Sequence, residues 1–148
     1  MHSFEQRHRY ERGVQLAPDR TYADVAEGVR AAIAEYTQAL DDGRIDELVA
    51  TFCPDGSCDI PGLGRHEGHA ALRDAYGKWA PSRPQRHLVV NTHVHRWDDE
   101  EAHATSDFVF ILKGEGGWAV QVVGRYRDVL HCTDGRWRFH PRVGEFVQ

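Results

Sequence analysis

The first half of the chain carries apolar residues at the spacing of an α-helix. Between Thr21 and Gly43 they recur four, four, three and four positions apart, so they share one face. Thr21 suits the N-cap, and Gly43 suits the position just past the end. This pattern predicts one long amphipathic helix. Its apolar positions are Val25, Val29, Ile33, Tyr36 and Leu40.

Two shorter helices are predicted after it. Residues 45–52 place apolar side chains at helical spacing and meet a stop at Pro54. Residues 71–79 repeat the pattern and end before Pro81. Between the two, "SCDIPGLGRHEG" predicts a short strand followed by a Gly/Pro-rich loop.

The rest of the chain has the pattern of β-strands. Four long runs are rich in Val, Phe, Trp and Tyr: "HLVVNTHVHRW", "AHATSDFVFIL", "WAVQVVGRYRDVLH" and "RWRFHPRVGEF". The segments between them, "DDEE", "KGEGG" and "TDG", are typical of antiparallel hairpins. Helices followed by such a meander predict an α+β fold, with N-terminal helices packed on one face of a strongly curved antiparallel sheet.

The length of 148 residues predicts one domain. We place it at residues 21–148, after a polar N-terminal arm at residues 1–20 that lacks periodicity. The arm is expected to be loosely ordered, to contain one turn of helix and to pack on a partner subunit.

Composition and charge narrow the functional class. Apolar residues make up 41% of the chain, which is typical of a folded globule. A net charge of −5 argues against a nucleic-acid surface. No apolar run approaches the ~20 residues of a membrane span, and "MHSFEQRHRYERG" lacks the apolar core of a signal peptide. Three cysteines without C-x-x-C spacing fit a reducing compartment, so we expect a soluble, cytoplasmic protein.

Several strings, in this order of elements, resemble the SnoaL-like group of the nuclear transport factor-like superfamily, a cone-shaped α+β barrel. They are "YTQALDDGRIDELVATFCPD", "HEGHAALRDAY", "RHLVVN", "GRYRDVL" and "DGRWRF", and the resemblance runs from about Thr21 to Arg142. It implies a pocket between the first helix and the concave sheet. The superfamily contains isomerases, dehydratases, polyketide cyclases, epoxide hydrolases, oxygenase subunits without active sites and binding proteins, so function has to be argued from the pocket residues.

The resemblance implies roles for three residues. Tyr36 falls where ketosteroid isomerases place the tyrosine that donates to a developing enolate oxygen. Asp41 falls where scytalone dehydratase and the bacterial bile-acid dehydratase keep an aspartate against the catalytic histidine. His87, in "RHLVVN", matches that histidine. Together the three resemble the dehydratase arrangement.

Three other positions depart from the related enzymes. Ile60 stands where the isomerases have a general-base aspartate and the dehydratases a second tyrosine. Asp59 precedes it and would point to the other side of a strand. Arg127 lies near the place of a protonated aspartic acid in the isomerases. A ketosteroid-type isomerase is therefore disfavoured, and the three residues remain candidates for substrate binding.

The residues themselves are suited to acid–base chemistry. An imidazole oriented by a carboxylate, as His87 would be by Asp41, can accept a proton at cellular pH. A buried phenol such as Tyr36 can donate to an oxygen that gains charge. No cofactor is needed for this chemistry. The alternative is structural: Tyr36 as a core tyrosine, and Asp41, next to Asp42 and Gly43, as a turn residue.

Strand alternation suggests further pocket residues. If His87 faces the pocket, Asn91 and His93 share its face and are expected to bind or orient substrate. His93 and His95 are also spaced to share a metal ion, but no third ligand at suitable spacing is evident, and we expect no metal.

The strand in "GRYRDVL" leaves two arrangements open. Either Arg125 and Arg127 or Tyr126 and Asp128 face inward. An inward arginine could hold a substrate carboxylate, whereas a cross-strand salt bridge is the simpler role.

Three functions are consistent with the sequence. The first is a cofactor-independent dehydratase, isomerase or cyclase acting on a hydrophobic, oxygenated small molecule, such as a polyketide or steroid-like ring. The second is a non-catalytic small-molecule-binding protein, and the third is a structural subunit of a larger assembly. By analogy with the superfamily, we expect a homodimer or homotrimer formed through the outer face of the sheet.

Overall fold

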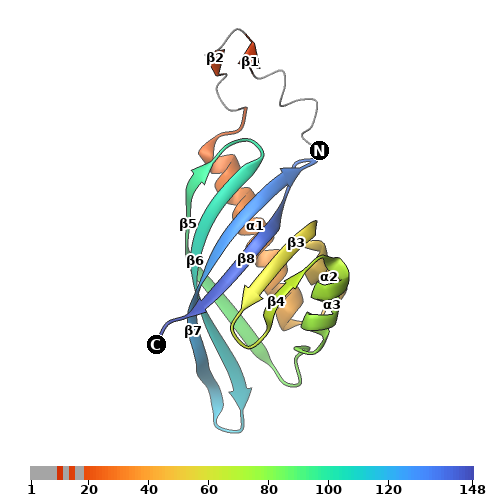
Figure 1. Ribbon diagram of the computed structural model, residues 1–148. Coiled ribbons are helices and arrows are strands. Elements are labelled where there is room, and N and C mark those ends of the chain that lie inside the picture. Colours follow the sequence, from red (N-terminus) through yellow and green to blue (C-terminus); the bar gives the residue numbers. More distant parts are fainter. Residues whose placement is uncertain (1–9, 12–13, 16–18) are drawn as a thin grey trace.

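The computed structural model describes residues 10–11, 14–15 and 19–148 (Figure 1). Near the N-terminus, strand β1 (Tyr10–Glu11) pairs antiparallel with strand β2 (Val14–Gln15). The remainder of the predicted arm lies outside the described residues, together with the turn of helix and the subunit contact expected of it.

Helix α1 (Tyr22–Asp41) begins and ends where the sequence predicts. The Asp24 backbone N–H donates to the Thr21 hydroxyl at 3.2 Å, and the Thr21 N–H donates to the Asp24 carboxylate at 2.9 Å. This capping box satisfies donors that a helix start leaves unpaired. At the other end, Gly43 has a φ of 71°, the left-handed conformation that glycine adopts most easily.

The two shorter helices are α2 (Ile45–Ala50) and α3 (His69–Gly77). The second predicted helix extended to Phe52, but Phe52 begins strand β3 (Phe52–Ile60) and is fully buried there. The loop expected before α3 contains strand β4 (Gly64–Glu67), which forms a hairpin with β3.

The four long strands predicted after residue 81 are confirmed. They are β5 (Gln85–Trp97), β6 (Glu101–Gly114), β7 (Gly117–Thr133) and β8 (Arg136–Phe146). In the described part of the chain, six strands form one sheet in the order β4-β3-β8-β7-β6-β5. The α+β class is confirmed, with one correction: β3 runs parallel to β8, so the sheet is mixed. Strand β8, the last strand of the antiparallel meander, lies next to β3 and runs in the same direction.

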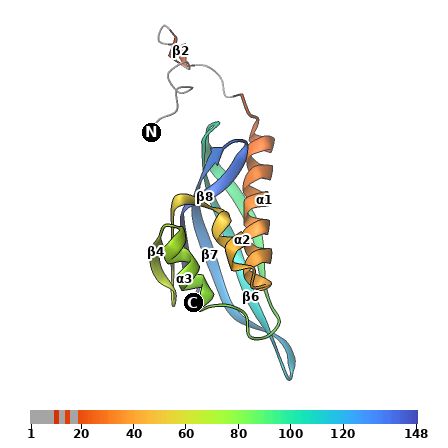
Figure 2. The same cartoon turned by 90° about the vertical axis from the view of Figure 1, so that its right-hand side faces the viewer.

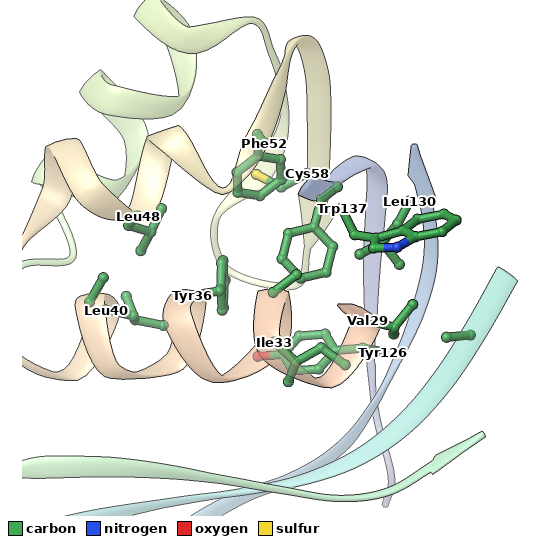
Figure 3. Close-up of a cluster of buried hydrophobic side chains, with 14 of the residues drawn as sticks. Val29, Ile33, Tyr36, Leu40, Leu48, Phe52, Cys58, Tyr126, Leu130 and Trp137 are labelled. Carbon is green, nitrogen blue, oxygen red and sulfur yellow. The ribbon is translucent and has the colours of Figure 1, made fainter. Parts of the chain in front are cut away.

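The helices cover one face of the sheet. Helix α1 runs along that face, and α2 and α3 lie beside the β3–β4 hairpin (Figures 1 and 2). The core lies between α1 and the sheet, where side chains of the helix meet aromatic and aliphatic residues of the strands (Figure 3). Gly28 lets Trp137 approach the helix closely, because a Cβ atom there would lie 2.3 Å from Trp137 Cδ1. None of the described helices is both long and apolar enough to cross a lipid bilayer.

Strand β5 forms one edge of the sheet, and its alternation breaks near the middle. The register with β6 shifts between Val90 and His93, and Asn91 has a φ of 55°. A bulge of this kind adds a residue to one strand, so the residues beyond it exchange faces. Val94 therefore turns into the core, while His93 is exposed.

Candidate functional site

Asp41 and His87 meet at the end of α1. His87 Nδ1 lies 2.6 Å from Asp41 Oδ1, and the His87 backbone N–H donates to Asp41 Oδ2 at 2.7 Å. The side-chain amide of Gln85 donates to Asp41 Oδ1 at 3.1 Å. Because an ionised carboxylate only accepts hydrogen bonds, we infer that the imidazole hydrogen is on Nδ1. Nε2 is then the nitrogen that can accept a proton.

The surroundings hold both groups of this pair in place. Asp41 is the last residue of α1, where the helix dipole disfavours a negative charge, and β5 supplies N–H groups that compensate for this. The Asp41 side chain is 3% exposed and that of His87 is 14% exposed. The ring of Phe110 stacks on the imidazole with 4.6 Å between centroids. The imidazole is therefore oriented by the carboxylate and by an aromatic face.

His87 lines a cavity of about 330 Å³ between α1 and the concave side of the sheet. Its walls are mostly aromatic and aliphatic, and among the described residues no Lys, Arg, Asp or Glu contributes to them. Such a site favours an uncharged, apolar ligand with a few polar atoms. The lining residues are Tyr36, Leu40, Ile60, Pro61, Trp79, Gln85, His87, Phe108, Phe110, Val122, Tyr126 and Phe146.

Tyr36 and Tyr126 line this cavity, and Tyr76 lies behind Tyr36. The Tyr36 and Tyr76 hydroxyl oxygens lie 2.7 Å apart, and both residues are almost fully buried. Burial raises the pKa of each well above its ordinary value, so both stay protonated at neutral pH. Burial raises the pKa of Tyr126, which lines the same cavity, to about 12. These phenols can donate hydrogen bonds but cannot act as bases.

A buried ion pair lies behind the tyrosines. Arg142 is 0% exposed, and its Nε lies 3.2 Å from Asp128 Oδ1. Its guanidinium carbon lies 3.6 Å from the ring centroid of Tyr126 and 4.3 Å from that of Tyr36. Burial raises the pKa of Asp128 to about 6, because desolvation outweighs the attraction of Arg142. A full positive charge thus packs against two tyrosines of the cavity wall.

A second, more open groove of about 1050 Å³ runs between α1 and β5. Asp41 and His87 line it, as does Thr37, whose hydroxyl is enclosed and has no hydrogen-bond partner in the part of the chain that the structure describes. His87 therefore borders both the cavity and the groove.

The structure brings several of the predicted site residues together. Tyr36, Ile60 and His87 line the cavity, and Asp41 lies directly behind His87. The geometry required of a His–Asp pair is present. The catalytic roles remain a proposal.

Asn91 and His93 do not line the cavity, contrary to our prediction. The bulge in β5 places His93 on the exposed face, and the Asn91 amide donates to Asp107 at 3.0 Å. Asn91 borders the open groove instead. The prediction assumed unbroken alternation along the strand.

Asp59 and Arg127 also lie outside the cavity. Asp59 is exposed on the face opposite Ile60. Arg127 is exposed and pairs with Glu145 on the next strand at 3.0 Å. The cross-strand salt bridge is thus the correct alternative for Arg127, and Tyr126 and Asp128 are the inward residues of β7.

Sequence reasoning missed Gln85, Tyr76 and Arg142, and it gave Asp128 only as one of two inward alternatives. Gln85, which holds Asp41, precedes His87 by two positions on the same face of β5, and that spacing could have indicated it. Tyr76 falls on the apolar stripe of α3, where its hydroxyl gave no separate signal. Arg142 and Asp128 lie on different strands, so only the strand register pairs them.

No group of three or more His, Cys, Asp or Glu side chains suited to a metal ion occurs among the residues that the structure describes. His93 and His95 have ring centroids 5.9 Å apart on the exposed part of β5.

Solved structures share this fold. Rv3472 from Mycobacterium tuberculosis, a protein of unknown function, has a TM-score of 0.76 and 24% identity over 82% of this chain and 71% of that one. A proposed scytalone dehydratase from Novosphingobium aromaticivorans has a TM-score of 0.72 and 22% identity, covering 82% and 83% of the two chains. A Catenulispora acidiphila protein, solved in complex with S-DNPA, has a TM-score of 0.75 and 25% identity, covering 84% and 94%.

Sequence comparison identifies the family of this chain. No curated protein matches this chain. The SnoaL-like domain model matches residues 21–143, and this chain therefore belongs to the SnoaL-like domain family.

Proposed function

We propose that this protein is a cofactor-independent acid–base enzyme, a dehydratase, isomerase or cyclase, that acts on an uncharged, oxygenated small molecule with an apolar ring system. The observation that supports this most is the 2.6 Å contact between His87 Nδ1 and Asp41 Oδ1 at the wall of an aromatic cavity. The similarity to the proposed Novosphingobium scytalone dehydratase agrees with it.

His87 acts as the general base. With Nδ1–H donated to Asp41, Nε2 can remove a proton from a carbon next to a substrate carbonyl. The imidazolium that forms is stabilised by the carboxylate behind it. General acid–base catalysis contributes about 10²- to 10⁴-fold in rate, so the substrate must carry an activating carbonyl.

The tyrosines stabilise the oxygen that gains charge. When the C–H bond breaks, the electron pair moves into the carbonyl and forms an enolate, which accepts hydrogen bonds from Tyr36 or Tyr126. In a dehydration, the enolate then re-forms the carbonyl and expels the β-hydroxyl group, which takes the proton from the His87 imidazolium and leaves as water. The enzyme returns to its starting state, and no redox partner is required.

The cavity restricts the substrate class. Its volume of about 330 Å³ is at the lower end of the range for small-molecule pockets, and no Lys, Arg, Asp or Glu of the described residues lines its walls. A compact, fused-ring β-hydroxy ketone fits both constraints, whereas a charged or long-chain substrate does not.

The test is a panel of aromatic β-hydroxy ketones, followed by the absorbance of the conjugated product. His87→Gln and Asp41→Asn are expected to lower turnover by about 10²-fold or more. His93→Gln, which changes a histidine on the exposed part of the same strand, serves as the matched control and is expected to match the parent. Parental turnover in His87→Gln would refute the acid–base role. Tight binding without chemical change would favour a binding protein instead.

We also propose self-association through the outer face of the sheet, in line with the homodimer or homotrimer expected from the sequence. Leu88 and Val123 are half exposed and lie on either side of Val109 in adjacent strands of that face. Such a contiguous apolar patch is typical of a subunit contact. Light scattering tests this: Leu88→Lys together with Val123→Lys should yield a monomer, and an unchanged mass would contradict the proposal.

A further inference from the structure

Arg142 occupies an unusual place in the core. It is a full positive charge with no exposed surface, surrounded by the rings of Tyr36, Tyr126 and Phe139. Its guanidinium carbon lies between 3.6 and 4.4 Å from the three ring centroids. Burying a charge is costly unless it is well paired. A core that needed only apolar packing would hold an aliphatic residue here.

The pairing of Arg142 is incomplete. Asp128 is the countercharge, but neither its oxygens nor any guanidinium nitrogen makes a hydrogen bond of good geometry within the described residues. Buried polar groups without partners are rare in folded proteins and require an explanation. Stability alone does not supply one, because a hydrophobic pair of similar volume is often as stable as a buried ion pair.

We propose that Arg142, held by Asp128, is a positioning residue that strengthens Tyr126 and Tyr36 as hydrogen-bond donors to a ligand oxyanion in the cavity. This rests on the proposed function of the same cavity. A cation against the ring favours the ionised form of a phenol and polarises its O–H bond. Burial raises the pKa of Tyr126, and the Arg142 guanidinium has the largest of the effects that lower it.

Hydrogen bonds among the tyrosines also lower the pKa of Tyr36 and of Tyr126, but they carry no charge, and the other charged groups near the two phenols do not supply this effect. The charges of Asp128 and Asp41 raise the pKa of Tyr126. Tyr76 on α3 and Cys58 on β3 face Tyr36 and carry no positive charge. His87 faces the same cavity and becomes positive only after it accepts a proton. In the resting site, Arg142 is therefore the cation that packs against the donors.

The effect can be measured without knowing the substrate. 2-Naphthol is an apolar phenol whose naphtholate form absorbs at longer wavelength than the neutral form. A pH titration of the bound probe therefore reports how strongly the cavity stabilises an oxyanion. In Arg142→Met/Asp128→Leu, we expect the bound probe to ionise at higher pH, with an affinity for naphtholate lower by about tenfold. Affinity for 2-methoxynaphthalene, which cannot ionise, should remain within about twofold.

Two further variants separate this role from a structural one. Arg127→Met/Glu145→Leu removes the exposed ion pair of the same two strands and should leave the ionisation of the probe unchanged. Arg142→Lys keeps the charge and should retain most of the parental affinity for naphtholate. It is compared with the parent if the double variant fails to fold. A folded double variant that ionises 2-naphthol like the parent would overturn the inference. His87→Gln with parental turnover would instead overturn the proposed enzyme and leave the naphthol result standing.

Discussion

The hydrogen bond between Tyr36 and Tyr76 gives a quantitative test of how the inner wall of the cavity is held together. Their hydroxyl oxygens lie 2.7 Å apart, and the two residues are 1% and 0% exposed. Tyr36→Phe removes one hydroxyl and leaves the other buried without this partner. A buried polar group that loses its partner lowers the free energy of unfolding by about 1–3 kcal/mol. Tyr76→Phe should have an effect of similar size.

The double variant Tyr36→Phe/Tyr76→Phe removes both partners at once. Its expected loss is only about 0.5–1.5 kcal/mol, the net contribution of one ordinary hydrogen bond. The two single losses should therefore exceed the loss in the double variant, with a coupling on the order of 1–3 kcal/mol.

Equilibrium urea unfolding, followed by tryptophan fluorescence, measures all four corners of this cycle. Tyr22→Phe is the matched control, because Tyr22 is 46% exposed and its hydroxyl can bond to water. Strictly additive losses, or a Tyr36→Phe variant as stable as the parent, would show that the two hydroxyls do not depend on each other. The Tyr36 hydroxyl would then be free for a ligand in the resting protein.

Three other predictions concern the elements that frame the site. Thr21→Ala should lower the free energy of unfolding by about 1 kcal/mol, whereas Thr21→Ser should keep the capping box; urea midpoints check both. Gly124→Ala places a Cβ atom 2.4 Å from the Phe108 ring, which lines the cavity. The free energy of unfolding should fall by about 1–3 kcal/mol, and 2-methoxynaphthalene should bind more weakly. Unchanged affinity would mean that Phe108 does not shape the cavity. The folded protein retains the Asp128 proton to about pH 6, whereas the unfolded chain releases it near 3.8. The free energy of unfolding of the parent should therefore fall by about 3 kcal/mol as pH rises through this window, relative to that of Arg142→Met/Asp128→Leu. If the free energy of unfolding changed with pH equally in the parent and in this variant, the prediction would be wrong.

The helical part of the fold could be predicted because its determinants are local. The Thr21 cap, the apolar stripe of α1 and the stop at Gly43 all act within a few turns of helix, and each was found where expected. Phe52 was misplaced because a single apolar residue fits the end of a helix as well as the start of a buried strand.

The Asp41–His87 pair was predicted from the family resemblance and not from the pattern of the residues. The two lie 46 positions apart in the chain, and no periodicity links the end of a helix to the start of a strand. Their contact depends on how α1 docks against β5. By contrast, the misplacement of Asn91 and His93 has a local cause, because one inserted residue reverses the side chains that follow it, up to the second register shift between Val94 and Arg96.

The charged core pair was beyond sequence reasoning for a different reason. An arginine in a strand is ordinarily assigned to the exposed face, as is correct for Arg127. Arg142 is buried because Asp128 is its direct neighbour across β7 and β8, and that register becomes known only with the sheet.

The parallel pairing of β3 with β8 has a consequence for how the molecule folds. β8 is the last strand along the chain, yet it lies between β3 and β7 in the sheet. The segment comprising α2, β3, β4 and α3 therefore has no edge to join until β8 has paired with β7. Contacts between residues so far apart in sequence form slowly, which predicts a late, rate-limiting docking step. During synthesis on the ribosome, this segment can bury its apolar side chains against the rest of the sheet only after β8 has emerged.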